Sequence, residues 1–229
     1  EIHERLVGSE MCIRDRFIVA IMSCAGILYG SLKAVSQTDI RRMLAYSSLG
    51  MMGYIGMGIA LGNYYGLIGA VLHIINHSIM KSALFFGSGA LKYRYGLVKL
   101  SDLGQLYRRM PKTMAVMVIC ALSMVGIPPT AGFFSKWYLA LAAADRGFYI
   151  CIGILIVSSL LNAVYFFRFF EKLFMGPEKE KTEKHPEEER ELPVSMLIPL
   201  IVCGILVLVL GFGNTWFIDV LSSAISEVA

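Results

Sequence analysis

Long apolar runs alternate with short polar segments along most of this 229-residue chain. A helix needs about 20 mainly apolar residues to cross the ~30 Å of hydrocarbon in a bilayer. Six runs approach or exceed that length, and they cover residues 17–35, 44–62, 66–91, 113–143, 147–170 and 194–218. The pattern predicts an all-α protein, a polytopic bundle of about six transmembrane helices. The fourth of these spans should be interrupted between Gly126 and Pro129, where glycine and proline disrupt the helix.

The composition supports a membrane protein. Hydrophobic residues make up 56% of the chain and charged residues only 17%, well below the quarter or so that is usual in soluble domains. Lysine and arginine concentrate in segments 33–42, 92–112 and 168–191, which alternate with the weakly charged loops of a six-span model. Basic loops face the cytoplasm in most inner (plasma) membrane proteins. We therefore attribute the net charge of +4 to basic loops on one side of the membrane, and we expect no nucleic-acid-binding face.

The polar segments divide the chain. Residues 1–16 are polar, lack the order of a signal peptide and resemble translated adaptor sequence, so we interpret them as a non-native leader. Residues 17–175 form a five-span membrane domain. Residues 176–193 form a charged linker that contains His185, and residues 194–229 hold the final span and a tail.

Three titratable residues stand four positions apart in one apolar run: His73, His77 and Lys81. On a helix they form a single row about 12 Å long. Ionisable groups within a span usually mark an ion or proton path. Histidine titrates near working pH, and a buried lysine can exchange its proton. Three neighbours are expected to hold water between these groups: Asn76, Ser78 and Ser82.

Metal and haem sites would each need residues that this row lacks. A zinc protease site would require a glutamate between the two histidines and a third ligand, and neither is visible. A bis-histidine haem would need a histidine on another span, and the other five runs have none. The five cysteines have no ligand spacing and are expected to be apolar fillers. A structural role, with the polar side chains satisfied between packed helices, stays open.

The interrupted run reads SMVGIPPTAGFFSKW, residues 123–137. Pro128 and Pro129 donate no backbone hydrogen bond, and a break at membrane depth is tolerated where it is buried or lines a wet cavity. Lys136 follows one to two turns later. We expect the freed carbonyls, water and this lysine to lie together. The simpler alternative is a proline kink with a lysine that snorkels to the surface.

A third segment, QTDIRRMLAYSS, covers residues 37–48 and precedes or opens the second span. Thr38 or Asp39 is suited to cap that helix. Arg41 and Arg42 follow within its first turn, where arginines reach the membrane surface.

These three segments occur in one order, and together they resemble the proton-translocating membrane subunits of respiratory complex I and of the Mrp-type multisubunit cation/proton antiporters. The resemblance covers residues 17–175 and leans toward the D-type subunits of the Mrp family. It implies a helix bundle with two inverted repeats, each with an interrupted span. This chain looks like the second repeat plus the final helix.

The resemblance also implies roles. His73, His77 and Lys81 look like the central proton relay, and Lys136 like the lysine of the second interrupted helix. Arg41 stands where relatives often have lysine, and arginine does not release its proton in proteins, so a shuttling role is doubtful there. The glutamate–lysine pair of the first repeat has no counterpart in this chain.

The expected function is therefore proton translocation within a multisubunit complex of the NADH-quinone oxidoreductase or Mrp type. Other membrane subunits are the expected partners. No flavin, quinone, nicotinamide or metal is expected on this chain, because it has no GxGxxG motif and no cysteine cluster. Two alternatives are a sodium/proton antiporter subunit and a structural assembly subunit without its own ion path.

Overall fold

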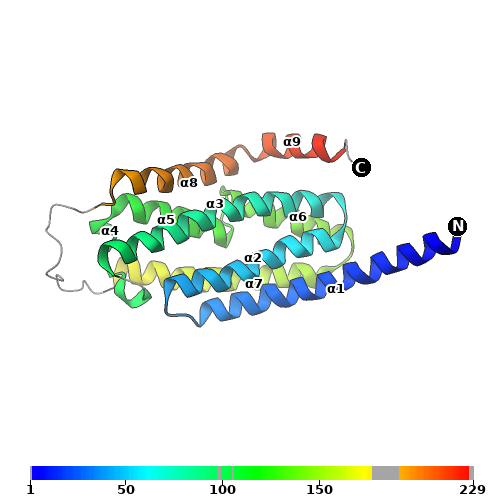
Figure 1. The fold of residues 1–229 in the computed structure, drawn as a ribbon, viewed down its shortest axis with the longest axis horizontal. Helices are drawn as coiled ribbons and strands as arrows, with labels where there is room; N and C mark the ends of the chain where they lie inside the picture. Colours follow the sequence, from blue (N-terminus) through cyan, green and yellow to red (C-terminus); the bar gives the residue numbers. More distant parts are fainter. Residues whose placement is uncertain (1, 97–98, 105, 177–190, 227–229) are drawn as a thin grey trace.

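The computed structural model describes residues 2–96, 99–104, 106–176 and 191–226, and the side chains among them from residue 14 to residue 224. Regular structure in these ranges is helical, apart from one isolated bridge between Asp39 and Lys99. The helices (Figure 1) are α1 (Ile2–Val35), α2 (Ile40–Leu61), α3 (Tyr64–Tyr95), a 3-10 turn (Leu100–Asp102), α4 (Leu106–Arg109), α5 (Pro111–Val125), α6 (Ala131–Asp145), α7 (Tyr149–Met175), α8 (Val194–Phe212) and α9 (Asn214–Ser226).

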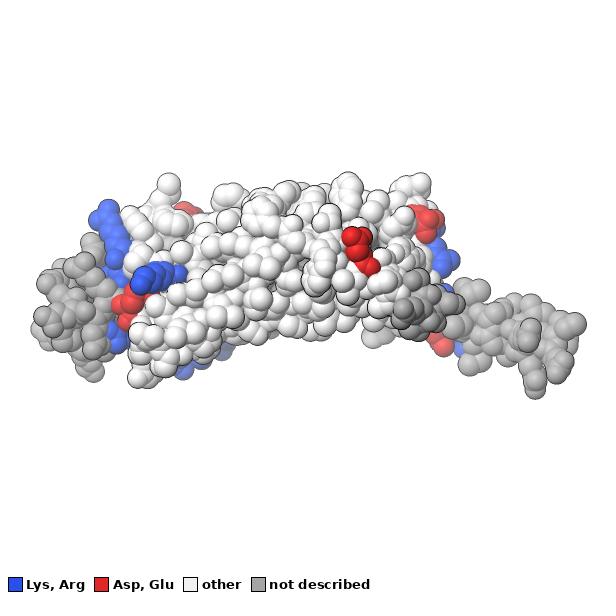
Figure 2. Space-filling view, turned by 90° about the horizontal axis from the view of Figure 1, so that it is seen from above, with Lys and Arg blue, Asp and Glu red and all other residues white. Residues whose placement is uncertain are grey.

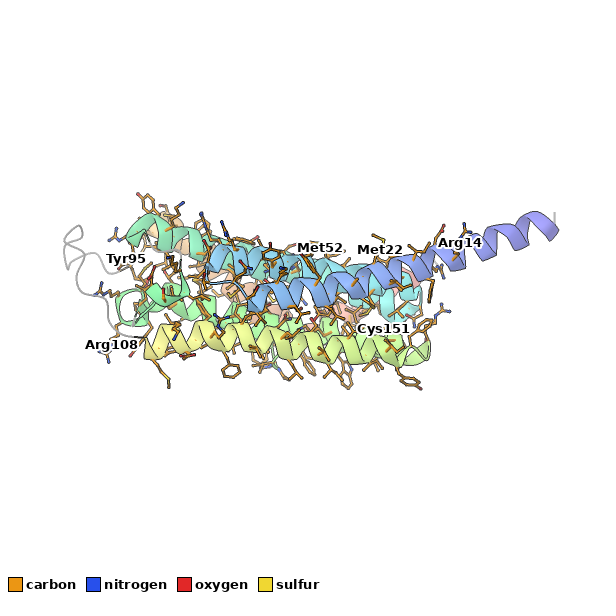
Figure 3. The ribbon with its side chains drawn as sticks, turned by 90° about the horizontal axis from the view of Figure 1, so that it is seen from below. Arg14, Met22, Met52, Tyr95, Arg108 and Cys151 are labelled. Atoms are coloured by element: carbon orange, nitrogen blue, oxygen red, sulfur yellow. The ribbon has the colours of Figure 1, made fainter. Side chains whose placement is uncertain are left out.

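The long helices run up and down along one common axis (Figure 1). α1, α3 and α7 finish at the same end of the bundle, and Figure 3 shows Tyr95 and Arg108 there, with Arg14 and Cys151 toward the opposite end. Charged side chains gather at the two ends in Figure 2, and the surface between them is mainly uncharged. Lys33 in the last turn of α1 and Lys92 and Arg94 in the last turn of α3 therefore share one end, as the charge pattern predicts.

Within the described ranges, five helices are long and apolar enough to span a membrane: 14–35 within α1, α2, α3, α7 and α8. The predicted fourth span is interrupted as expected, and it forms two shorter helices, α5 and α6. The predicted last span, 194–218, is wrong at its C-terminal end. α8 ends at Phe212, and a separate helix, α9, begins at Asn214 after Gly213.

Local caps explain the other boundaries. The Asp39 carboxylate accepts hydrogen bonds from the backbone N–H of Arg41 (2.8 Å) and Arg42 (3.2 Å), so α2 begins at residue 40 rather than 44. Of the two predicted caps, Asp39 is the correct one. Gly62 ends α2 with φ +58°, a left-handed conformation that glycine adopts without strain. The Asn63 side chain then caps α3 by accepting from Gly66 N–H at 3.0 Å.

The end of the linker contacts the start of α5 at the basic end of the bundle. The Glu191 carboxylate accepts from the backbone N–H groups of Lys112 (3.0 Å) and Thr113 (3.4 Å) at the start of α5, where a negative charge is favourable. The rest of the linker, 177–190 with His185, lies outside the described residues. So do the side chains of residues 1–13, and their backbone from Ile2 continues α1 as one helix. The leader interpretation stays a prediction.

α1 and α7 pack together as parallel helices with a regular register. The Ser31 and Ser158 hydroxyls lie 2.9 Å apart, and one heptad earlier on both helices the Cys24 and Cys151 thiols interact. Because residues one heptad apart lie on the same face of a helix, the two pairs fix both the direction and the rotation of α1 against α7.

This register predicts a specific cross-link. Treating membranes with copper–phenanthroline in air, which oxidises two adjacent thiols to a disulfide and reduces oxygen, should join Cys24 to Cys151. Peptide mass spectrometry would detect the joined peptide, and Cys24→Ser should remove it. If the cross-linked products contain Cys24 joined only to other cysteines, the register of α1 against α7 is wrong.

Candidate functional site

The row on α3 is buried as predicted. His73, His77 and Lys81 are 1%, 7% and 5% exposed, and they line one face of an uninterrupted helix. The prediction for two of their neighbours is wrong. Ser78 and Ser82 are exposed, because each follows a member of the row by one residue and is turned about 100° away from it.

Asn76 does face the interior. Its side-chain amide donates to the Ala131 carbonyl at 2.8 Å, at the first residue of α6. This hydrogen bond ties α3 directly to the broken helix, and it leaves the row on α3 next to the break.

The Lys81 amine is held by α2. It donates to the Leu44 carbonyl at 2.7 Å and to the Ser47 hydroxyl, and it lies 5.7 Å from the Phe85 ring centre. Both oxygen partners are buried, so Lys81 does not reach the surface of the bundle. Charge-assisted hydrogen bonds of this kind hold a cation in a fixed place in a membrane interior.

The break between α5 and α6 covers residues 126–130 and contains Pro128 and Pro129. Gly126 has φ +92° and ends α5; its N–H and that of Ile127 both donate to the Leu122 carbonyl. The Ser123 hydroxyl accepts from Gly132 N–H at 3.1 Å. The chain therefore makes a compact turn and resumes as a helix, and the predicted interruption is confirmed.

The Lys136 amine points back to the open end of α5. It donates to the carbonyls of Met124 and Val125, each at 2.9 Å, and to the Ser159 hydroxyl at 3.2 Å. The last carbonyls of a helix lack internal partners and carry the negative end of its dipole. A lysine at this place satisfies them, so the snorkelling alternative for Lys136 is wrong.

A row of rings leads from the α3 histidines to Lys136. The ring centres of His73 and His77 lie 6.3 Å apart in a stacked arrangement, and those of His73 and Tyr54 lie 5.1 Å apart. The Lys136 amine in turn lies 5.5 Å from the Tyr54 ring centre. Tyr54 therefore stands between the α3 histidines and the lysine of the broken helix.

Hydrogen bonding within the row is incomplete among the described residues. His73 Nδ1 lies 3.0 Å from the Ser135 hydroxyl, but His73 Nε2 and His77 Nδ1 are buried without a protein partner there. Buried polar atoms of this kind are usually satisfied by internal water. The described residues contain no group of three His, Cys, Asp or Glu side chains placed to hold a metal ion.

Two residues named in the sequence analysis, Asp39 and Arg41, lie away from the histidines and lysines of the site. Asp39 caps α2 at the basic end of the bundle, and Arg41 follows it in the first turn with a half-buried side chain. The structure brings together the α3 row and Lys136, and it places Asp39 and Arg41 outside that group.

Several polar residues of the site were not predicted. Ser47 and Tyr54 lie on α2, Ser135 on α6, and Ser158, Ser159, Asn162 and Tyr165 on α7. A sequence signal for them exists: Ser47 and Tyr54 are seven residues apart, and Ser158, Asn162 and Tyr165 recur at intervals of four and three. Both spacings place polar groups on one face of an otherwise apolar helix.

Comparison with known proteins identifies the family. Residues 10–162 match the model described as NADH:quinone oxidoreductase/Mrp antiporter, transmembrane. The chain belongs to this family. It is 44% identical over 210 residues to NADH-quinone oxidoreductase subunit N of Desulforudis audaxviator, and 33% identical over 196 residues to the D-type subunit of the Na(+)/H(+) antiporter of Alkalihalophilus pseudofirmus. The oxidoreductase match covers 88% of this chain and the antiporter match covers 85%.

Solved structures show the same fold. The Mrp complex of a Dietzia species has a chain that matches with a TM-score of 0.83 and 25% identity, covering 93% of this chain and 47% of that one. Respiratory complex I of Thermus thermophilus matches with a TM-score of 0.80 and 21% identity, covering 90% and 42%. The chain is thus a multi-pass, all-helical membrane protein of antiporter-like fold. It spans less than half the length of the curated relatives it matches, 42% for the oxidoreductase subunit and 39% for the antiporter subunit.

Proposed function

We propose that this chain is the proton-translocating part of a membrane subunit in a multisubunit complex of the NADH-quinone oxidoreductase or Mrp type. Protons pass between Lys81, His77, His73 and Lys136 through the protein interior, with water between the groups that do not touch. No redox centre is proposed on this chain, so the driving energy comes from other membrane subunits of the complex. The multisubunit assemblies among its structural neighbours support such partners.

One observation carries this proposal: four titratable side chains form one row in the interior of an apolar bundle, three on one face of α3 and Lys136 beyond the Tyr54 ring. Two lysines stand at its ends, each held by carbonyl and hydroxyl oxygens rather than by a carboxylate. A lysine paired to a carboxylate would be held in its charged form. Lysines bound to neutral oxygens retain the ability to release and take up a proton.

We further propose that the end of the bundle with the basic segments faces the cytoplasm of a cell whose inner membrane holds the complex. The positive-inside rule supports this orientation. In this orientation, α2 starts on the cytoplasmic side, and Lys81 is hydrogen-bonded to the first half of α2. Lys136 lies at the break of the α5–α6 span.

The test uses the complete gene, expressed with its neighbouring subunits in inverted membrane vesicles. NADH addition should acidify the vesicle interior if the complex is a redox-driven pump, and Lys136→Ala should reduce the initial rate several-fold, since each lost relay group raises the barrier for transfer. The amount of assembled complex is measured in parallel by blue native electrophoresis.

Sodium addition separates the second candidate. The 33% identity to a subunit of a Na(+)/H(+) antiporter favours a sodium/proton exchanger as the alternative, and sodium-driven proton efflux without an NADH response would establish it. A structural assembly subunit makes a different prediction: Lys136→Ala would reduce the amount of complex and leave the flux per complex unchanged. Normal flux per complex in that variant contradicts the relay.

A further inference from the structure

A second buried polar row lies on α7, apart from the histidines. Ser158, Asn162 and Tyr165 are 0%, 2% and 0% exposed, on a helix whose opposite face, with Val157, Leu160 and Val164, is exposed. A polar row on the inner face of an apolar helix is costly unless its members have partners. Each of these three residues has partners among the described side chains.

The row begins near Lys81. The Lys81 amine donates to the Ser47 hydroxyl, and the Tyr165 hydroxyl of α7 also interacts with Ser47. Tyr165 donates in turn to the Asn162 side-chain oxygen at 3.0 Å. Ser47 therefore joins the lysine of α3 to the polar row of α7 through residues that include no histidine.

The other end of the row reaches Lys136. The Tyr54 hydroxyl lies 2.6 Å from that of Ser158, and it also interacts with Ser159 and Asn162. The Lys136 amine donates to the Ser159 hydroxyl at 3.2 Å. A series of hydroxyl groups thus extends from each lysine to Asn162, which lies between Tyr165 and Tyr54.

Asn162 has one unused group at this meeting point. Its side-chain nitrogen is buried and has no hydrogen-bond partner among the described residues. An amide N–H in that condition is usually satisfied by an internal water. A water held there would bridge the Tyr165 and Tyr54 sides of the row, because an amide itself does not pass a proton on readily.

We propose that Ser47, Tyr165, Tyr54 and Ser159, with a water positioned by Asn162, form a second proton connection between Lys81 and Lys136 that bypasses His77. This proposal rests on the proposed function, since it needs a relay that ends at the two lysines. Asn162 is a positioning residue in it. Tyr54 is shared, because its ring also packs against His73.

The transfer balances as a chain of single proton steps. The Lys81 ammonium gives a proton to the Ser47 oxygen. The Ser47 hydroxyl, which donates to the Leu44 carbonyl at 2.9 Å in the structure, turns to Tyr165 and passes its own proton there. Tyr165 passes its proton to the water, the water passes one to Tyr54, and Tyr54 passes its proton to Ser159. Ser159 gives its proton to a neutral Lys136 amine. Every hydroxyl and the water end neutral, Lys81 ends as an amine, and Lys136 ends as an ammonium.

The experiment compares four forms of the complete subunit in its complex: wild type, Tyr165→Phe, His77→Leu and the double variant. Tyr165→Phe keeps the ring that packs against Phe166 and removes only the hydroxyl. If the two connections act in parallel, each single variant should keep about half of the flux per complex and the double variant less than about a tenth. Tyr149→Phe, an exposed tyrosine on the same helix, is the matched control and should leave flux unchanged.

The outcomes separate the two proposals. Wild-type flux in Tyr165→Phe, together with a double variant equal to His77→Leu alone, overturns the second connection. A double variant that retains only the product of the two single effects also overturns it, because independent structural defects would behave that way. Lys81→Ala is measured in the same assay as a further variant, and unchanged flux in it overturns the proposed function itself. A third outcome is a loss of flux in Lys81→Ala together with a double variant whose flux equals the product of the two single effects. That outcome supports the proposed function and overturns the second connection.

Discussion

Replacing Lys81 with methionine should lower proton flux per assembled complex by at least about tenfold, which corresponds to about 1.4 kcal/mol in the barrier. Methionine keeps most of the side-chain length and leaves an apolar group in a buried site, so the helix packing is retained. What is lost is the amine that donates to the Leu44 carbonyl and the Ser47 hydroxyl. Both proposed connections begin at this amine, so no bypass remains.

The measurement is the initial rate of vesicle acidification, divided by the amount of complex on a native gel. Lys92→Met is the matched control, since Lys92 lies on the same helix but is exposed in its last turn. That variant should pump at the wild-type rate. Wild-type pumping by Lys81→Met in a fully assembled complex would show that the row on α3 serves packing only.

The parts of this site that the sequence predicts depend on a single helix or on one short segment of the chain. The four-residue spacing of His73, His77 and Lys81 places them on one face wherever the helix packs, and Pro128 and Pro129 interrupt their span in any surroundings. The sequence signal is then local and sufficient. The cap by Asp39 is local in the same way.

The missing parts depend on how neighbouring helices are rotated and placed in depth. Ser47 and Ser48 are adjacent in the sequence, and only Ser47 meets Lys81, because α2 turns that side toward α3. Ser78 and Ser82 were expected beside the row and instead face outward. An apolar run gives the length of a span and says little of its rotation, since lipid and protein interior are similarly apolar. The end of α8 was missed for a related reason: the apolar run continues past Gly213 into α9.

The second large effect is expected at Gly132, where the broken helix resumes. A Cβ built at this position meets the Ser123 carbonyl oxygen at far less than contact distance, with the Ser123 carbonyl carbon at 2.9 Å. The obstructing atoms are backbone and cannot turn aside as a side chain would. Gly132→Val must therefore push α6 away from α5, and we expect a loss of about 2 kcal/mol or more in stability, in the range of strongly overpacked cores.

This displacement would reach the site directly. Gly132 N–H bonds to the Ser123 hydroxyl, the Gly132 carbonyl accepts from Ser135, and Ser135 contacts His73. Lys136 would also lose its alignment with the carbonyls at the end of α5. The assembled complex should fall severalfold on a native gel, and its thermal unfolding in detergent should shift downward. Gly153→Val is the control, because Gly153 is an exposed glycine of α7 with nothing within 4 Å of its added Cβ; equal assembly and equal melting of the two variants would mean that α5 and α6 do not approach this closely.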